Sequence, residues 1–327
     1  MELANTDIID GLRGAGLIGD GDPVLEPLTG GVSCDVWKVE TPIGPIVVKR
    51  PLPQLRVAAE WHAPIERGQS DIRWLRRARE VDPDIVPEVL AELPIGYAFA
   101  MRFLPDCPVW KDELVAGNVD QSFAAAVGSG IAAIHAATAY NDQDRAAFSN
   151  EAIFSALRID PFLLYVADKE TELAPILRAL ASDLSKSKIA LVHGDVSPKN
   201  ILVTSKGPVF LDAECAVYGD PAFDLAFCTT HLLLKAVWLG DDTLRDAANA
   251  LVDAYRAAIN WEDGDGLLLR AGKLTATLLL ARVEGKSPAS YLTDDNHKNI
   301  VRNQARAYLL VPAPIDALVA SWKRTDS

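Results

Sequence analysis

The chain has 327 residues, of which 49% are hydrophobic and 24% charged, and its formal net charge is −13. This apolar share supports a folded core and excludes a disordered chain. The negative charge, with no basic run, argues against a nucleic-acid partner, whose phosphates it would repel. The four cysteines lack the paired spacing of zinc sites, so we expect them to be reduced.

Short β-prone runs predict strands in the N-terminal third. Val36–Val39 and Pro45–Lys49 flank the turn-prone Thr41–Gly44, which predicts a hairpin. A further apolar run, Tyr97–Pro105, predicts a strand that ends at a proline.

The segment Leu28–Ser33 precedes this hairpin and contains the pair Gly30 and Gly31, followed by Ser33. Glycines that lack side chains let backbone N–H groups approach phosphate oxygens. The same pair is equally typical of an ordinary hairpin entry, so both interpretations stay open.

Helical periodicity dominates the rest of the chain. Leu244, Ala248, Leu251 and Tyr255 recur three or four residues apart and form one apolar stripe. The uncharged stretch 122–141 lacks the bulky apolar residues of a membrane span, so we expect no membrane association. The predicted helices run over 120–139, 223–239, 243–259, 267–284 and 297–310.

The segment Leu191–Val203 carries groups suited to phosphoryl transfer between two apolar runs. Asp195 follows the first run, where its carboxylate would meet a substrate hydroxyl, and we interpret it as the catalytic base. Asn200 starts the second run, and we interpret its amide oxygen as a magnesium ligand.

Asp212 and Glu214 follow shortly after, in a segment that we expect to be extended. Alternation of side chains along a strand would aim both carboxylates at one face, where they would offer Mg²⁺ hard oxygen ligands. Taken singly, each such residue is more often a turn former or a helix cap. The joint spacing favours kinase-type chemistry.

At these positions the chain resembles the aminoglycoside phosphotransferase and choline kinase superfamily of small-molecule kinases. The resemblance implies an α+β, protein-kinase-like fold with a β-rich small lobe over 1–104 and a mostly helical large lobe over 105–327. It also implies structural roles for His193 and Asp224. The motif Asp212-Ala213-Glu214 is similar to the Asp-x-Glu motif of methylthioribose kinases. The matching residues are His193, Gly194, Asp195, Asn200 and Asp212.

The resemblance also implies a nucleotide site in the small lobe. Lys49 matches the strand lysine that contacts the α- and β-phosphates, and we expect Glu66 to pair with it, with Asp71 as the competing partner. The predicted hinge would bind adenine through the backbone near Arg102, Phe103 and Leu104. The implied cofactors are ATP, with GTP as an alternative, and Mg²⁺.

The acceptor is less constrained by the sequence. Trp238, Arg282 and Glu284 are candidates to bind it, on helices after the metal motif. Acidic side chains there would hold an amine, whereas Arg282 would grip a sugar hydroxyl or a carboxylate. Methylthioribose kinases carry an arginine pair, but Ala281 occupies one of its positions here, which argues against methylthioribose itself.

The sequence therefore predicts an ATP-dependent kinase acting on a hydroxyl of a sugar, amino-sugar or amino-alcohol. A non-catalytic nucleotide-binding module and a methylthioribose-kinase-like sugar kinase are the alternatives. A protein kinase is disfavoured because Ser197 stands where such enzymes have lysine, and no Ala-Pro-Glu segment follows. The N-terminal residues do not resemble a signal peptide, so we expect a cytoplasmic protein; a homodimer is compatible with the sequence.

Overall fold

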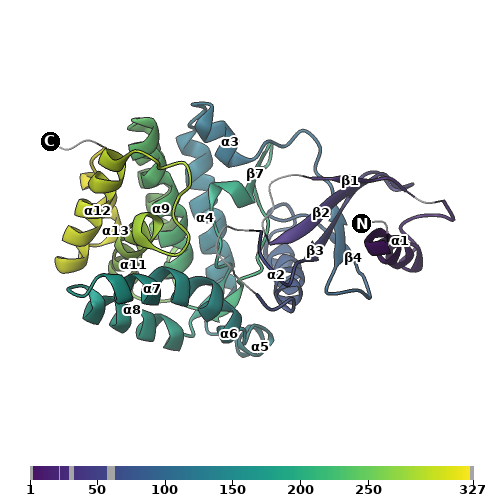
Figure 1. Cartoon of the computed structure of the whole chain (residues 1–327), viewed down its shortest axis with the longest axis horizontal. Coiled ribbons are helices and arrows are strands. Elements are labelled where there is room, and N and C mark those ends of the chain that lie inside the picture. The colour runs from purple at the N-terminus through teal and green to yellow at the C-terminus, as the bar shows by residue number, and fades with distance from the viewer. Residues whose placement is uncertain (1–2, 22, 29–32, 57–62, 325–327) are drawn as a thin grey trace. The chain divides into compact units, whose positions relative to one another are not determined.

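The computed structural model describes residues 3–21, 23–28, 33–56 and 63–324. The chain divides into two compact units, and Figure 1 labels many of their helices and strands. Unit 1 is Met1–Cys107 with Leu211–Glu214, and unit 2 is Pro108–Phe210 with Cys215–Ser327. Unit 1 thus extends past the predicted boundary at Leu104 and includes the predicted metal segment.

Unit 1 is built on a five-stranded antiparallel sheet of order β1-β2-β3-β5-β4. The predicted hairpin is confirmed as β2 and β3, and Gly44 closes its turn with a φ of 98° and a hydrogen bond to Thr41 O. The strands are β1 (Leu25–Pro27), β2 (Cys34–Val39), β3 (Ile46–Pro51), β4 (Val89–Glu92) and β5 (Phe99–Arg102).

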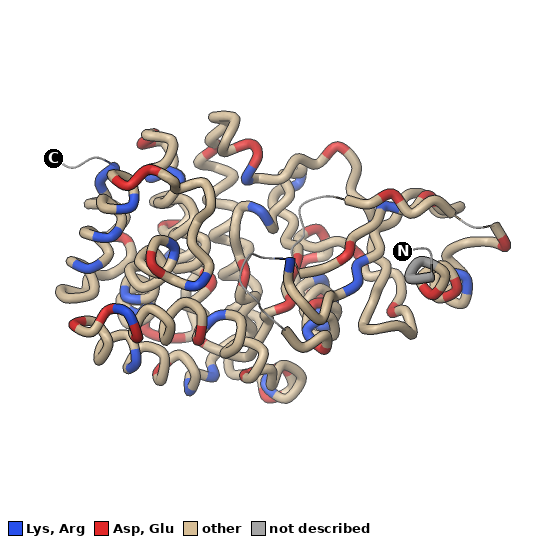
Figure 2. The backbone as a smooth tube through the Cα atoms, viewed as in Figure 1, with Lys and Arg blue, Asp and Glu red and all other residues tan. Residues whose placement is uncertain are grey.

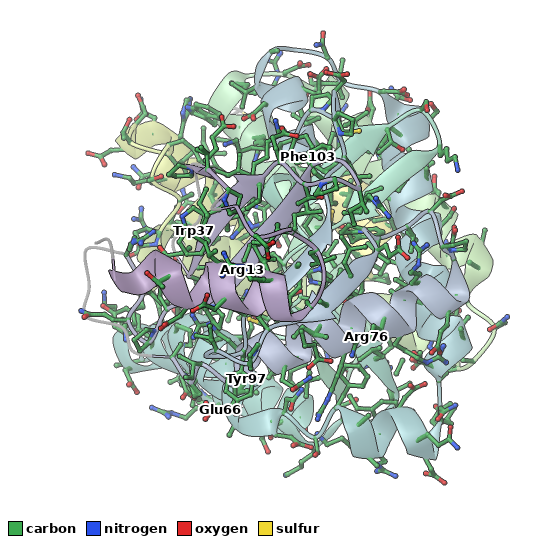
Figure 3. The ribbon with its side chains drawn as sticks, turned by 90° about the vertical axis from the view of Figure 1, so that its right-hand side faces the viewer. Arg13, Trp37, Glu66, Arg76, Tyr97 and Phe103 are labelled. Carbon is green, nitrogen blue, oxygen red and sulfur yellow. The ribbon has the colours of Figure 1, made fainter. Side chains whose placement is uncertain are left out.

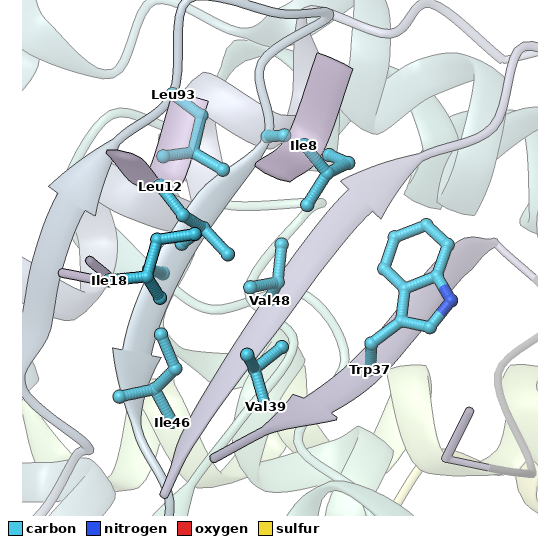
Figure 4. Packing of buried hydrophobic residues seen from close by; sticks show 10 residues of the cluster. Ile8, Leu12, Ile18, Trp37, Val39, Ile46, Val48 and Leu93 are labelled. Carbon is cyan, nitrogen blue, oxygen red and sulfur yellow. The ribbon is translucent and has the colours of Figure 1, made fainter. Parts of the chain in front are cut away.

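An N-terminal helix, α1 (Leu3–Gly14), covers one face of this sheet. Ile8 and Leu12 are four residues apart and therefore share one helix face. Figure 4 shows them directed at the side chains of Val39 and Val48, and the whole cluster is buried. Trp37 and Val39 on β2 and Ile46 and Val48 on β3 are two residues apart on their strands and supply the matching sheet face.

The strand predicted over Tyr97–Pro105 is shorter in the structure, because β5 begins only at Phe99. Gly96 and Tyr97 both have positive φ, 53° and 59°, and form a tight turn instead. Helix α2 (Arg67–Val81) starts against this turn at Gly68, where a Cβ atom would lie 2.8 Å from Tyr97 O. The close backbone approach therefore requires glycine.

Unit 2 is mostly helical and confirms the α+β class. Helices α4 and α10 approach closely, since a Cβ on Gly128 would lie 2.2 Å from Leu251 O. The predicted helices are confirmed as α4 (Gln121–Thr138), α9 (Ala222–Leu239), α10 (Thr243–Ala258), α11 (Gly264–Glu284) and α12 (Asp295–Leu310). The sequence did not predict α3 (Trp110–Val115), α5 (Asp142–Ala147), α6 (Glu151–Phe154), α7 (Tyr165–Lys169), α8 (Ala174–Lys186) and α13 (Ile315–Ser321).

Two small antiparallel sheets frame the motif segment of unit 2. One pairs β6 (Ala190–Val192) with β9 (Val217–Gly219), and the other pairs β7 (Ile201–Thr204) with β8 (Gly207–Phe210). A π-helical stretch, η1 (Ser155–Leu164), follows α6 directly. Such stretches often mark functional sites.

Helix α9 is long and apolar enough to cross a membrane by length and composition alone. However, 89% of its apolar window is buried inside the protein. This burial identifies α9 as a core helix of unit 2.

Charged residues are spread along both units (Figure 2). Many form exposed local pairs, such as Arg76 with Glu92 in unit 1. A smaller group of charged side chains is buried, and it includes Lys49, Asp195, Glu214 and Asp224, which the sequence analysis singled out.

Candidate active site

The predicted metal segment of unit 1 is not extended, which corrects the sequence interpretation. Asp212 has a φ of 70°, a left-handed conformation that is strained for a residue with a side chain. The next amide, Ala213 N, donates to Asp71 Oδ1 at 2.8 Å. The turn, rather than strand alternation, brings Asp212 and Glu214 together with Asp71, so that their oxygens lie within 4.8 Å of one another.

Lys49 on β3 pairs with Asp71 and not with Glu66, so the predicted partner was wrong and the competitor is found. Lys49 Nζ lies 2.6 Å from Asp71 Oδ2 and 3.2 Å from Glu214 Oε1, and it also pairs with Asp212. Glu66 is exposed at the N-cap of α2 (Figure 3), and its position along the helix puts it on a different face from Asp71.

Both oxygens of Glu214 are already engaged. Its Oε2 accepts from Arg67 Nε at 2.9 Å, and its Oε1 accepts from Cys34 Sγ at 2.5 Å. Arg67 is fully buried and also donates to four backbone carbonyl groups, at Ser33, Leu52, Ala63 and Pro64. We call Lys49, Arg67, Asp71, Asp212 and Glu214 the paired cluster.

Burial and neighbouring charges set the ionisation of the paired cluster. Burial raises the pKa of Asp71 to about 6, against the opposing effect of Lys49. Burial lowers the pKa of Lys49, but Asp212, Asp71 and Glu214 outweigh it and hold the pKa well above its ordinary value. Burial also raises the pKa of Cys34, which therefore stays a thiol and donates to Glu214.

The chemistry of these donors fits a hard divalent cation, because Mg²⁺ prefers carboxylate oxygens. Lys49 and Arg67, however, already neutralise much of their charge. The side chain of Asp212 is 26% exposed, whereas those of Asp71 and Glu214 are almost completely buried. Asp212 is therefore the member of the paired cluster best suited to a metal.

The His193-Gly194-Asp195 loop of unit 2 follows β6 and is held by Asp224. Asp224 accepts from His193 N at 2.7 Å and from Gly194 N at 2.8 Å, and it contacts His135 Nε2 at 3.2 Å. Gly194 has a φ of 79°, and a Cβ there would lie 2.7 Å from Cys215 O. Only glycine fits this turn without strain.

Asp195 is 7% exposed and closely surrounded. Its backbone N donates to His193 Nδ1 at 3.1 Å, and Asn200 Nδ2 donates to both its O and its Oδ2 at 3.0 Å. Arg158 Nη2 lies 3.2 Å and Lys199 Nζ 3.1 Å from the same Oδ2. Since the amide nitrogen of Asn200 is used in this way, its oxygen is the atom left for a metal.

The sequence analysis missed Arg158 and Lys199. Arg158 lies on η1 and donates to Gly194 O and Leu157 O as well as facing Asp195. Its signal was a basic residue in a mostly apolar segment, 154–164. Lys199 lies inside the motif, but nothing in its spacing distinguishes it from a solvated side chain.

The acceptor candidates lie in unit 2, and the structure groups only two of them. Trp238 packs against Tyr291, with ring centroids 4.6 Å apart, and Tyr291 also affects the ionisation of Arg282. Glu284 instead pairs with Arg302, with Oε1 accepting from Nε at 2.5 Å.

The remaining nucleotide-site predictions lie in unit 1. Gly30 and Gly31 lie outside the described residues, and Ser33 O accepts from Arg67. Arg102 Nη2 is 3.2 Å from Glu88 Oε2, and Leu104 is partly buried. Phe103, labelled in Figure 3, lies beneath Lys38 Nζ, 5.2 Å from its ring centroid.

Comparison with known proteins gives one family match. Residues 24–267 match the model of a family described as the phosphotransferase enzyme family, APH. A methylthioribose kinase of Pectobacterium carotovorum subsp. carotovorum is 26% identical over 225 residues, which cover 61% of this chain and 56% of the relative. The chain thus spans little more than half the length of this curated relative.

Solved structures share the fold at low identity. A choline/ethanolamine kinase family protein from Mesorhizobium loti superposes with a TM-score of 0.57 and 15% identity, covering 98% of each chain. The amicoumacin kinase hAmiN, in complex with AMP-PNP, Ca²⁺ and Ami, gives a TM-score of 0.56 and 12% identity, covering 93% of each chain. These likenesses support the kinase-like α+β architecture.

Proposed function

We propose, from the premise that this chain belongs to the phosphotransferase enzyme family, that it transfers the γ-phosphoryl group of ATP to a hydroxyl group of a small molecule. The observation that carries this proposal is the Asp195 loop. Its backbone is fixed by Asp224, and its carboxylate is oriented by Asn200, Arg158 and Lys199. Such preorganisation is what a general base requires.

Asp195 accepts the hydroxyl proton as the acceptor oxygen bonds to the γ-phosphorus and the bond to ADP breaks. The hydrogen bond from Asn200 and the ion pairs with Arg158 and Lys199 all engage Oδ2. We therefore assign Oδ1 to the incoming hydroxyl.

Lys49 and Asp212 of unit 1 and Asn200 of unit 2 are the residues we assign to the phosphates and Mg²⁺. Magnesium, when bound, neutralises the charge that develops on the phosphate oxygens. Glu214 supports Asp212 indirectly, because Arg67, Lys49 and Cys34 hold its carboxylate in place. ATP is the proposed donor, with GTP as the alternative.

The test is the variant Asp195→Asn, with ADP formation followed over a panel of sugars, sugar acids, amino-sugars and amino-alcohols. We expect turnover to fall about 10²- to 10⁴-fold with nucleotide affinity retained. The control is Asp168→Asn, which changes an exposed aspartate of unit 2 and should leave turnover unchanged. Undiminished turnover in Asp195→Asn would refute the role of Asp195.

Two alternatives remain distinguishable. The similarity to methylthioribose kinases and the Asp212-Ala213-Glu214 motif favour a sugar acceptor, which a thio-sugar in the panel would reveal. A non-catalytic nucleotide-binding module would be stabilised by ATP and yet form no ADP with any acceptor.

A cytoplasmic location fits this function. ATP is an intracellular phosphoryl donor, and Cys34, Cys107, Cys215 and Cys228 are all free thiols. Free thiols are typical of a reducing compartment.

A further inference from the structure

Lys235 on α9 is a buried cation. It is 3% exposed, and no carboxylate in the described part of the chain lies within ion-pair distance of its ammonium group. Its Nζ lies over the ring of Tyr291, 5.2 Å from the centroid. Buried lysines are nearly always paired, so an unpaired one indicates that a ligand supplies the missing anion.

Arg282 on α11 adds a second cation beside Lys235. Its Nη1 donates to Ser287 O at 2.5 Å, but its buried Nε has no hydrogen-bond partner among the residues that the structure describes. Burial and then Arg282 lower the pKa of Lys235 to about 8, which shows that the two charges repel one another. Within the described ranges, the buried hydroxyl group of Tyr291 also has no hydrogen-bond partner.

Arg282 lies close to the proposed catalytic base, because its guanidinium group and that of Arg158 lie over the same Phe162 ring, 6.0 and 5.9 Å from the centroid, and Arg158 Nη2 is 3.2 Å from Asp195 Oδ2. Asp195 is among the charges that favour the charged form of Arg282, and Arg158 opposes it. Burial, with Arg282, Lys235, Lys199 and Arg158, lowers the pKa of His231 well below its ordinary value, so that His231 stays neutral. We call Arg158, Lys199, Lys235 and Arg282 the basic cluster; Arg158 and Lys199 pair with Asp195, whereas Lys235 has no carboxylate partner among the described residues.

We propose that the phosphoryl acceptor carries a carboxylate or phosphate group, which Lys235 and Arg282 bind while the acceptor hydroxyl reaches Asp195. This inference rests on the proposed function and narrows its substrate class to anionic alcohols. A polyamine would be repelled by the basic cluster, even though the whole chain carries a net charge of −13. The negative net charge of the chain therefore favours a cationic acceptor, whereas the basic cluster favours an anionic one. The basic cluster acts at the shorter distance, so its effect is the stronger of the two.

The basic cluster has a second possible anion, the phosphoryl group in transfer. If Lys235 and Arg282 bind this phosphoryl group, the loss of Lys235 should lower kcat/KM equally for every acceptor. Kinetics with matched acceptors separate the two sources.

The experiment compares glucose, glucuronate, glucose 6-phosphate and glucosamine as acceptors for the wild-type protein and for Lys235→Met. We expect the wild type to prefer an anionic acceptor by about 30-fold or more in kcat/KM. Lys235→Met should abolish that preference through KM for the acceptor, with KM for ATP unchanged, and Lys235→Arg should restore part of it. The control Lys186→Met, at an exposed position on α8, should behave as the wild type.

A preference for glucose or glucosamine would overturn the inference and leave the proposed function intact. An equal loss of kcat/KM for all four acceptors in Lys235→Met would also overturn the inference. If no acceptor is turned over, thermal stability in inorganic phosphate and in acetate, against chloride at equal ionic strength, still tests the site. Wild-type stabilisation that Lys235→Met loses would support it, and equal stability in all three salts would overturn it.

Discussion

The two buried charge clusters differ in how they are balanced. In the paired cluster of unit 1, Lys49 and Arg67 face Asp71, Asp212 and Glu214, and every cation has a carboxylate within 3.2 Å. In the basic cluster of unit 2, Lys235 has no such partner among the described residues, and the Nε of Arg282 is unsatisfied. Buried charges that are paired within the chain hold the surrounding side chains in place, whereas buried charges without a partner in the chain can be paired by a ligand.

This difference predicts opposite responses when one cation is removed. Loss of a paired cation strands a buried carboxylate and destabilises the fold. Loss of an unpaired cation removes an unfavourable buried charge, so it stabilises the fold and weakens only ligand binding. Unfolding measurements on matched variants therefore test the comparison without knowledge of the acceptor.

The largest effect on stability is expected for Arg67→Met. It removes the Arg67 partner of Glu214 and the side-chain hydrogen bonds to the carbonyl groups of Ser33 and Leu52, of which the Ser33 carbonyl keeps its bond from Leu52 N. We expect unit 1 to lose about 3 to 5 kcal/mol of unfolding free energy, measured by urea denaturation. A loss below about 1 kcal/mol would mean that the paired cluster does not hold the Asp212 segment.

Lys235→Met should have the opposite sign. The lowering of the Lys235 pKa from 10.5 to about 8 corresponds to an unfavourable contribution of about 3 kcal/mol at neutral pH, since a tenfold change is worth about 1.4 kcal/mol. Methionine has a similar length and no charge, so we expect the variant to be more stable than the wild type by up to that amount. A less stable variant would show that Lys235 has a structural partner.

The pH dependence sharpens the same prediction. The unfolded chain holds the Lys235 proton up to a pKa near 10.5, and the folded protein releases it near 8. Unfolding free energy in the wild type therefore rises with pH between these values, relative to Lys235→Met. The stability gap should narrow by about 2 kcal/mol from pH 7 to pH 9.5. If the difference in unfolding free energy between the wild type and Lys235→Met does not change with pH, Lys235 is not an unpaired charged residue.

Regular elements were predictable from the sequence because they follow local periodicity. The hairpin and the long helices are examples, and the Asp195 loop was found because its spacing is fixed within one segment. The choice of Asp71 over Glu66 depends on where α2 begins and which face it turns to the sheet, and no local pattern fixes that phase. The positive φ of Asp212 likewise accompanies the hydrogen bond from Ala213 N to Asp71, a residue far away in the sequence.

Lys235 left a signal that the sequence analysis did not use. It is the only Lys, Arg, Asp or Glu residue between Phe227 and Leu239, a stretch whose other positions are apolar or neutral. A single cation in a core helix predicts a buried charge. What it faces, however, comes from α11, and only the folded structure brings Arg282 to it.

The smallest effect is expected for Arg76→Met, which removes an exposed pair on the same helix as Arg67. Arg76, which is labelled in Figure 3, pairs with Glu92, and the side chains of the two residues are 50% and 41% exposed. Water screens such a pair, so we expect a change of no more than about 0.5 kcal/mol in urea denaturation. The substitution is chemically identical to Arg67→Met and therefore isolates burial as the cause of the difference. Equal losses of unfolding free energy in Arg67→Met and Arg76→Met would instead have a common cause, either the helix propensity of methionine or the change in net charge. Burial would then not explain the contrast between the balanced and the unbalanced cluster.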